Sequence, residues 1–313
     1  MISIVFVGRN DNYGGDFDAR LLSTTRHNTC ALEARGIAYE IVFVEWNPLP
    51  NRRLLSELIC TEFAAARCFV VDGEIHRLVS CNRHIAVLEY HAKNVGARMA
   101  RGQWLLLTNP DNYLGREILD FLGNGPPDPD TLYRAGRINI DDAREIDAPD
   151  RIDPFRRDPP PFIQGSGDFA LCSQHLFTRI GGFREDLAFT NTHKDSIFCH
   201  AVYDLTAKAQ KIGKTFHLRH ARDDATRRRI EYAWHQVPRT AQPTFGLEGV
   251  CVEEPYAATI TRLRLRDELV AEAEARAVPH PRVPRAYRIP RIQRLKAHPL
   301  VRKAVNRIRS FSR

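Results

Sequence analysis

The chain has 313 residues, with 46 Lys and Arg against 38 Asp and Glu and a formal charge of +8. Its length suits one large or two modest domains, and 43% hydrophobic residues can supply a buried core, which excludes a disordered chain. Residues 279–313 hold eleven of the basic residues and no acidic one, which leaves 35 basic against 38 acidic residues in 1–278. The excess positive charge therefore belongs to a basic tail on a slightly acidic body.

The N-terminal run and the cysteines indicate a location. The opening apolar run has strand length and lacks a basic leader and a cleavage site, and no apolar run approaches the roughly 20 residues of a membrane span. The seven cysteines are odd in number and never spaced as C-x-x-C, which favours reduced thiols over disulfides or a zinc site. We therefore expect a cytoplasmic protein.

Strand-like and helix-like segments alternate over the first 112 residues. Apolar, β-branched and aromatic runs predict strands, and helical spacing of apolar residues predicts the segments between them. The expected strands are 2–7, 40–46, 68–71, 78–80 and 104–107, and the expected helices are 18–35, 51–66 and 88–102. This alternation predicts an α/β fold with a mainly parallel central sheet and flanking helices, in which ligands bind at the carboxyl ends of the strands. The loops 9–15, 45–48 and 108–112 should therefore meet at one crevice.

Beyond residue 112 the pattern is less regular. Turn-rich breaks at 123–130 and 147–161 flank a strand-like run at 132–140. We expect four regions: 1–122 and 123–257 as two halves of the main domain, 258–278 as a charged helix, and 279–313 as a basic tail.

The basic tail has an amphipathic pattern. Beyond Pro299 the apolar residues fall on one helical face and the basic residues elsewhere, as in helices that lie on anionic membranes. A solvated tail is the alternative because the segment is rich in proline and charge. A nucleic-acid arm is less expected because aromatic residues are not interleaved with the basic ones.

Asp111 is the first candidate for chemistry. It follows a buried strand in the sequence Asn109-Pro110-Asp111-Asn112. A carboxylate in this position, with a neighbouring amide oxygen, can ligate a hard divalent cation that also takes oxygens from a diphosphate. An ordinary turn is the alternative, because Asn-Pro and Asp-Asn are common turn dipeptides.

The order of motifs along residues 2–220 resembles the GT-A nucleotide-sugar glycosyltransferases, in particular those of glycosyltransferase family 2. A first strand enters a polar loop, and a second strand ends at Glu45. A helix carries N-x-G-x-x-x-A-x-G from Asn94 to Gly102, and the next strand ends in Asn109-Pro110-Asp111. The motifs G-D-F at 167–169, G-G-F-x-E at 181–185, Lys194-Asp195 and H-L-R-H at 217–220 then follow in order.

The resemblance implies a metal and donor site in the first half of the domain. Asp111 would be the main carboxylate on a Mn²⁺ or Mg²⁺ ion, with His217 and His220 as further ligands. Asn109 replaces the first aspartate of the D-x-D motif and would contact the ribose through its amide. Glu45 would accept a hydrogen bond from the base, which favours a UDP-sugar, with guanine as the alternative base because it also carries an N–H there. The remaining donor-binding candidates are Arg9, Asn10, Asp11, Lys93 and Asn94.

The resemblance also implies a general base in the second half. Asp195 is expected to take the proton of the acceptor hydroxyl as it attacks the anomeric carbon. A purely structural role as the N-cap of a helix is the alternative for this residue. Asp168 and Glu185 are expected to bind the acceptor and are the next candidates for the base.

Together these features predict an inverting, metal-assisted glycosyltransferase. It would move a sugar from a nucleotide diphosphate to a hydroxyl of a glycan or lipid-linked glycan, at the inner face of the cytoplasmic membrane. A nucleotidyltransferase on a related sheet is one alternative, although the loop 8–15 lacks the basic, glycine-rich pattern usual there. A non-catalytic module tethered to membrane or nucleic acid is the other, and no nucleic-acid partner is expected.

Overall fold

The computed structural model describes residues 1–289 except 126, 149–151, 155, 165 and 222–229. The amphipathic helix predicted beyond Pro299 lies outside the described residues. Within them, no helix is both long enough and apolar enough to cross a bilayer.

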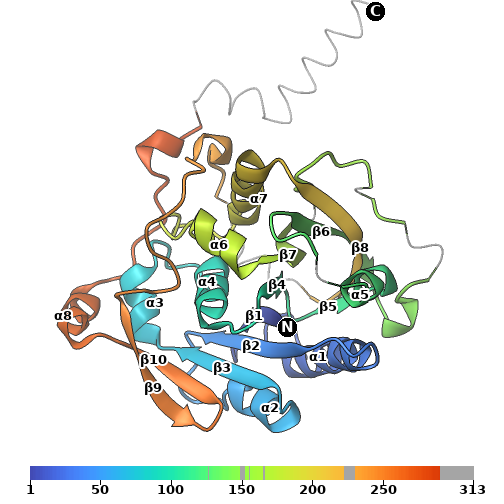
Figure 1. The fold of residues 1–313 in the computed structure, drawn as a ribbon. Helices are drawn as coiled ribbons and strands as arrows, with labels where there is room; N and C mark the ends of the chain where they lie inside the picture. The colour runs from blue at the N-terminus through green and yellow to red at the C-terminus, as the bar shows by residue number, and fades with distance from the viewer. Residues whose placement is uncertain (126, 149–151, 155, 165, 222–229, 290–313) are drawn as a thin grey trace, which may run out of the picture.

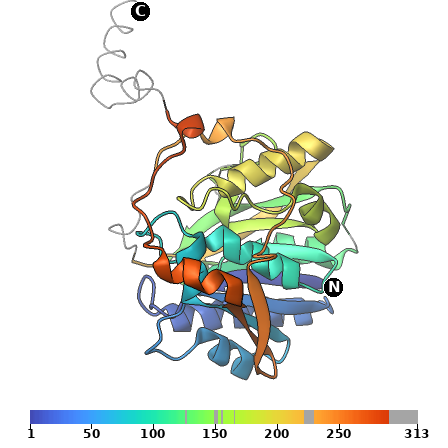
Figure 2. The ribbon, with the colours of Figure 1, turned by 90° about the vertical axis from the view of Figure 1, so that its left-hand side faces the viewer.

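One mixed sheet runs through the whole molecule and is covered by helices on both faces (Figures 1 and 2). Its strands are β1 (Ile2–Gly8), β2 (Tyr39–Trp46), β3 (Ala66–Val71), β4 (Trp104–Thr108), β5 (Asn112–Leu114), β6 (Leu132–Ile140), β7 (Phe169–Ser173), β8 (Ala209–Leu218), β9 (Cys251–Ala257) and β10 (Ile260–Leu265). The described α-helices are α1 (Phe17–Glu33), α2 (Leu55–Glu62), α3 (Gly73–Val79), α4 (Glu89–Met99), α5 (Arg116–Gly123), α6 (Gln174–Ile180), α7 (Lys194–Thr206) and α8 (Asp267–Ala275).

The strand order is β5-β8-β6-β7-β4-β1-β2-β3-β10-β9, with β1 in the middle. From β1 the chain proceeds to β2 and β3 on one side, and then returns to β4 on the other side, all in parallel. Such a reversal of direction leaves a crevice outside the carboxyl ends of the two strands between which it occurs. The loop after β1 and the turn after β4 therefore lie at the same edge of the sheet, as the sequence predicts.

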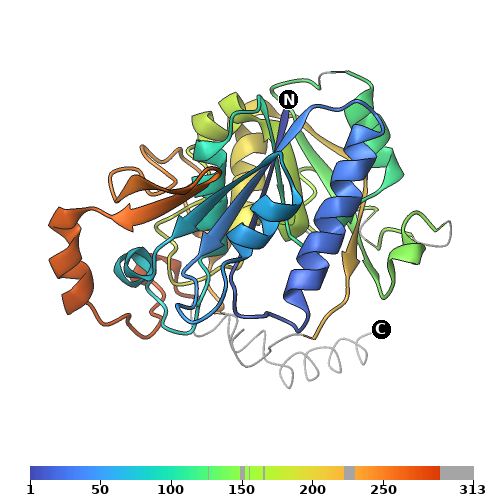
Figure 3. The ribbon, with the colours of Figure 1, turned by 90° about the horizontal axis from the view of Figure 1, so that it is seen from below.

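The core has two layers because β1 is buried on both faces. Ile4 and Phe6 pack on the face covered by α1, α2 and α5, whereas Val5 and Val7 pack on the face covered by α4, α6 and α7. Figure 3 shows α1 and α2 in front of the sheet when it is viewed from below. Gly96 allows α4 to lie close to the sheet, since a Cβ atom there would come within 2.4 Å of Val5. The predicted α/β class with flanking helices is confirmed.

The charged helix predicted over 258–278 is wrong in its first half. Residues Ile260–Leu265 form β10, which pairs in parallel with β3 and antiparallel with β9. Leu263 and Leu265 alternate with arginines, which is the period of a strand, and the helix begins only at Asp267. The division at 257/258 consequently falls inside the β9–β10 hairpin. The strand predicted at 78–80 is also wrong, because residues 78 and 79 end α3.

Candidate functional site

Asp111, His217 and His220 converge beside the carboxyl end of β4. The Oδ2 atom of Asp111 lies 3.4 Å from Nε2 of His217 and 3.1 Å from Nε2 of His220. The pairing of β5 with β8 explains this proximity, because it sets Asn112 opposite His217 and directs the amide of Leu218 to the carbonyl of Asp111. Residues more than 100 positions apart in sequence are thereby held within 4.8 Å at their ligand atoms.

The carboxylate of the cluster is buried and carries a negative charge. Asp111 is 6% exposed, and this burial by itself would raise its pKa; the hydrogen bonds with His217 and His220 outweigh it and hold the pKa below its usual range. The carboxyl is therefore ionised at neutral pH. Nδ1 of His217 is buried without a hydrogen-bond partner among the described residues.

One carboxylate oxygen and two imidazole nitrogens form a donor set that fits a divalent cation. Imidazole is a better ligand for borderline transition metals than for Mg²⁺, whereas carboxylate suits Mg²⁺ and Mn²⁺ alike. The residues predicted as metal ligands are thus brought together, and their chemistry favours Mn²⁺ over Mg²⁺.

The loop after β1 forms the other wall of the cluster. Arg20 of α1 donates hydrogen bonds to the carbonyls of Tyr13, Gly14 and Gly15, and so fixes the loop. The ring of His220 meets Tyr13 edge-on at 5.1 Å. Gly14 has a φ of +71° and leaves room for His220, because a Cβ atom there would come within 2.4 Å of Nδ1 of that ring.

We expect Gly14→Ala to weaken metal binding by about tenfold, because the added methyl group displaces His220 from the cluster. Gly15→Ala is the matched control: Gly15 also has positive φ, at +74°, but a Cβ atom there meets nothing within 4 Å. Both variants should lose stability from backbone strain, and Gly14→Ala should lose more because its Cβ atom would also come within 2.8 Å of the carbonyl oxygen of Ala221; thermal unfolding measures both losses. Titration with Mn²⁺ separates them, and equal Mn²⁺ affinity in the two variants would contradict a tight fit around His220.

A polar network lies next to the cluster. The Nζ atom of Lys93 donates to Glu89 at 2.9 Å, to Oδ1 of Asn109 at 2.9 Å and to the carbonyl of Gly167 at 3.2 Å. Asn109 donates in turn to Asp168 at 2.7 Å, and Asp168 pairs with Arg137 at 2.6 Å. The side chains of Asn109 and Lys93 are therefore engaged with protein partners.

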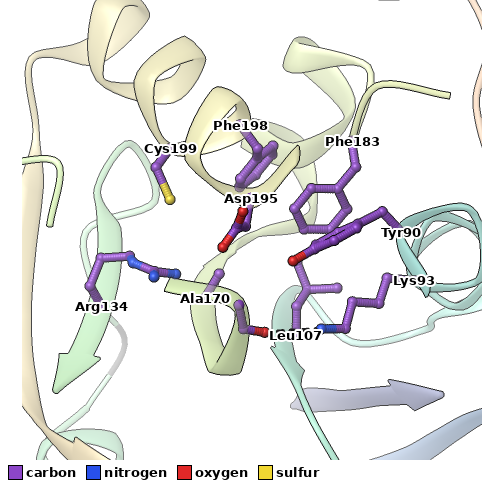
Figure 4. A pocket seen from close by; sticks show the side chains of 10 residues that line it. Tyr90, Lys93, Leu107, Arg134, Ala170, Phe183, Asp195, Phe198 and Cys199 are labelled. Carbon is purple, nitrogen blue, oxygen red and sulfur yellow. Dashed lines mark hydrogen bonds between the residues drawn. The ribbon is translucent and has the colours of Figure 1, made fainter. Parts of the chain in front are cut away.

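Asp195 lies in the first turn of α7 and lines a small pocket with Tyr90, Lys93 and Arg134. Figure 4 shows its carboxylate pointing into this pocket, between the guanidinium of Arg134 and the hydroxyl of Tyr90. Burial, and then the charge of Asp195, raise the pKa of Tyr90 well above its usual value, so the phenol stays protonated. His193 is the N-cap of α7, so the alternative role of Asp195 as the N-cap is wrong.

Lys93 joins the pocket to the metal cluster. It lines the pocket of Asp195 and also binds Asn109, which lies two residues before Asp111. Lys93 therefore lies between the pocket of the candidate base and the turn that carries Asp111, and it reaches that turn through Asn109.

Lys194 lies directly before the candidate base and is fully buried. Its Nζ atom is 3.5 Å from Nδ1 of His91, and burial lowers the pKa of Lys194 to about 7 despite the opposing charges of Glu185, Asp186 and Glu89. A folded chain with this amine neutral binds fewer protons than the unfolded chain between pH 7 and the ordinary lysine pKa.

We expect the free energy of unfolding to increase as the pH rises above about 7. In this range the unfolded chain keeps a proton on Lys194 that the folded chain has lost, so a higher pH disfavours unfolding. Lys194→Met should remove this slope and be more stable than the parent at pH 8. Thermal unfolding of both proteins from pH 6.5 to 9 tests the expectation, and parallel curves would show that Lys194 keeps its charge in the fold.

Several predicted donor-side residues have structural roles. Glu45 is 0% exposed, and its two oxygens accept hydrogen bonds from the backbone of Leu55 and Ser56 and from the Ser56 hydroxyl. It holds the N-terminus of α2 and is not placed to reach a base. Asn10 is also buried, and it bonds the backbone of Leu49 and of residues 52 and 53.

Asn94 and Glu185 bind each other at 2.8 Å. Asn94 also bonds both backbone groups of Phe183, while Glu185 accepts from the amide of Gly246. This pair fixes α4 to the G-G-F turn, so both side chains have a structural role. Of the loop residues, Arg9 and Asp11 form a partly exposed pair at 3.1 Å at the rim of the crevice.

Sequence reasoning missed three arginines of the site: Arg20, Arg134 and Arg137. Arg134 is 1% exposed and donates to the carbonyl of Phe169. Its position in a strand that alternates apolar and polar residues was only a weak indication that Arg134 is buried. Its burial depends on partners 28 to 35 residues away in sequence.

The fold and the site together define an α/β protein with a candidate metal centre at the carboxyl edge of its sheet. No protein-family model matches the sequence, and no curated protein matches it significantly. The assignment to glycosyltransferase family 2 therefore stays a prediction.

Similar solved structures include TarS of S. aureus, at 11% identity and a TM-score of 0.48, over 69% of this chain and 60% of that chain. The catalytic domain of Drosophila β1,4-galactosyltransferase 7 is similar at 13% identity and a TM-score of 0.44, over 86% and 95% of the two chains. Mannosyltransferase PcManGT from Pyrobaculum calidifontis is similar at 12% identity and a TM-score of 0.45, over 69% and 56%. The chain thus spans about 60% of the TarS structure. All three TM-scores are below 0.5. The function proposed below therefore rests on the residues of the site.

Proposed function

We propose that the protein is an inverting glycosyltransferase that transfers a sugar from a nucleoside-diphosphate donor to a hydroxyl of a glycan or lipid-linked glycan. The observation that supports this most is the convergence of Asp111, His217 and His220 at the carboxyl edge of the sheet, beside the loop after β1. A cation site there suits a ligand that carries a diphosphate.

Each group of residues has a role in this proposal. Asp111, His217 and His220 would hold Mn²⁺ or Mg²⁺, and the ion would stabilise the charge of the departing diphosphate. Arg9 and Asp11, which pair with each other and are partly exposed, would contact the nucleotide, whereas Glu45 and Asn10 are buried and engaged in the fold.

Asp195 would accept the proton of the acceptor hydroxyl as the oxygen attacks the anomeric carbon. Arg134 and the protonated Tyr90 flank the carboxylate and would fix its orientation. Asp168, which is held by Asn109 and Arg137, is better placed to position the acceptor side than to carry a proton, because both its oxygens already accept hydrogen bonds.

A thermal-shift comparison of nucleoside diphosphates tests the proposal. With Mn²⁺ present, the matching diphosphate at 100 times its Kd should raise the unfolding temperature by about 4 °C. Without Mn²⁺ the shift should largely disappear, and Mg²⁺ should restore less of it than Mn²⁺. If the protein binds Mn²⁺ but no nucleoside diphosphate raises its unfolding temperature, the proposed donor is contradicted.

A further inference from the structure

Cys60 and Cys68 lie in contact between α2 and β3, away from the candidate site. Cys60 is in the last turn of α2, Cys68 is in β3, and their sulfur atoms are 3.3 Å apart. Cys68 is fully buried, whereas Cys60 is half-buried. One sulfur of the pair can therefore be reached by a small solute, and the other lies directly behind it.

Local contacts keep the two sulfurs together. The amide of Cys68 donates to the carbonyl of Thr259 at 2.9 Å, and the sulfur of Cys60 is 3.8 Å from the same oxygen. A disulfide needs a sulfur–sulfur distance of about 2.05 Å. The two sulfur atoms would reach this distance by rotation of the two side chains. A small backbone shift would help, because Cys60 lies near the end of α2.

The two thiols differ in acidity, and this difference indicates which of them reacts first with an oxidant. The Cys68 thiol stabilises the Cys60 thiolate and lowers the pKa of Cys60 to about 7, while that same hydrogen bond and burial raise the pKa of Cys68. A thiolate is the nucleophile in thiol oxidation. Cys60 is thus suited to react first and Cys68 to resolve the product.

We propose that Cys60 and Cys68 form a reversible thiol–disulfide pair with a peroxide as oxidant. The Cys60 thiolate attacks one peroxide oxygen, the O–O bond breaks, and with one proton the products are a sulfenic acid and water. The Cys68 sulfur then attacks the Cys60 sulfur, the S–O bond breaks, and a second water leaves. Two electrons pass from the two thiols to the peroxide, and an added dithiol reverses the change.

The disulfide would fix α2 at both ends. Glu45 already holds its N-terminus, next to the loop 47–53 that packs against Asn10. The bond to β3 would tie its C-terminal turn to the sheet. Closing a loop of this length should raise the unfolding temperature of the oxidised protein by about 4 °C relative to the reduced protein.

Peptide mapping of the full chain tests this proposal independently of the proposed transferase function. Trypsin separates residues 54–67 from 68–77, and each peptide carries one cysteine. After stoichiometric hydrogen peroxide and alkylation, we expect the two peptides to be joined by a bond that dithiothreitol cleaves. Separate peptides, or Cys60 oxidised to sulfinic acid beside an alkylated Cys68, would overturn it.

Three variants assign the steps. Cys68→Ser should leave a Cys60 sulfenic acid that dimedone traps, and Cys60→Ser should leave Cys68 unoxidised. Cys30→Ser is the matched control, because Cys30 is an exposed thiol on α1, and the cross-link should form in it as in the parent. Loss of the cross-link in Cys30→Ser would show that the partner of the reactive thiol is misassigned.

Discussion

Asp111→Asn is expected to reduce sugar transfer by about 10³-fold, together with a loss of Mn²⁺ binding. The substitution keeps the size of the side chain but removes the anion that Nε2 of His217 and of His220 approach at 3.4 and 3.1 Å. A site with two neutral imidazoles and an amide has no charge to offset that of a divalent ion. The electrostatic stabilisation of the departing diphosphate is then lost along with the metal.

Two measurements separate this effect from misfolding. Mn²⁺ titration followed by electron paramagnetic resonance reports the loss of the ion directly, and circular dichroism checks the fold. Asp141→Asn removes an equivalent charge from an exposed pair with Arg219, in the segment next to His220, and should transfer sugar within twofold of the parent. Full Mn²⁺ affinity in Asp111→Asn would place the cation site elsewhere.

The parts of this site that could be predicted from sequence are those fixed by local patterns. Apolar strands that end in polar loops predict which residues reach the carboxyl edge, and Asp111 lies in the turn after such a strand. The histidines could be added because the order of motifs resembles a known family. The pairing of β5 with β8 brings His217 next to Asp111, and His220 follows shortly after the end of β8 and reaches the same carboxylate.

The roles of the donor-side residues could not be predicted because they depend on tertiary partners. Glu45 does end a strand, but α2 begins where its carboxylate can cap the helix, and this consumes both oxygens. Asn94 belongs to a helix motif, yet its amide is satisfied by the turn at Phe183, 89 residues away. Buried polar groups usually find hydrogen-bond partners elsewhere in the fold, and sequence alone does not show which polar residues near a site are engaged in this way.

The segment 258–278 illustrates a second limit. Its charge content favours a helix, whereas two leucines at strand period match the free edge of β3. β10 forms because its pairing with β3 satisfies the backbone groups that β3 would otherwise expose, and β9 is then the edge strand. The membrane contact predicted for 279–313, and the acceptor, remain predictions.

Asp195→Asn is expected to lower kcat for transfer by about 10² to 10⁴-fold, the range lost when a general base is removed. The amide keeps the position in the first turn of α7 but cannot accept the acceptor proton. Donor and Mn²⁺ binding should stay within about twofold, because Asp195 is not among the residues of the metal cluster. Asp204→Asn is the matched control, since Asp204 is on the same helix in an exposed pair with Arg239.

The comparison with Asp168→Asn identifies the base. Asp168 is held by Arg137 and Asn109, so its loss should raise the KM for the acceptor as the network loosens and should change kcat far less. Asp195→Asn should instead lower kcat and leave that KM nearly unchanged, because the group that accepts the proton is gone. If Asp168→Asn loses kcat and Asp195→Asn retains it, the proton is accepted by Asp168 and the carboxylate at α7 only orients the acceptor.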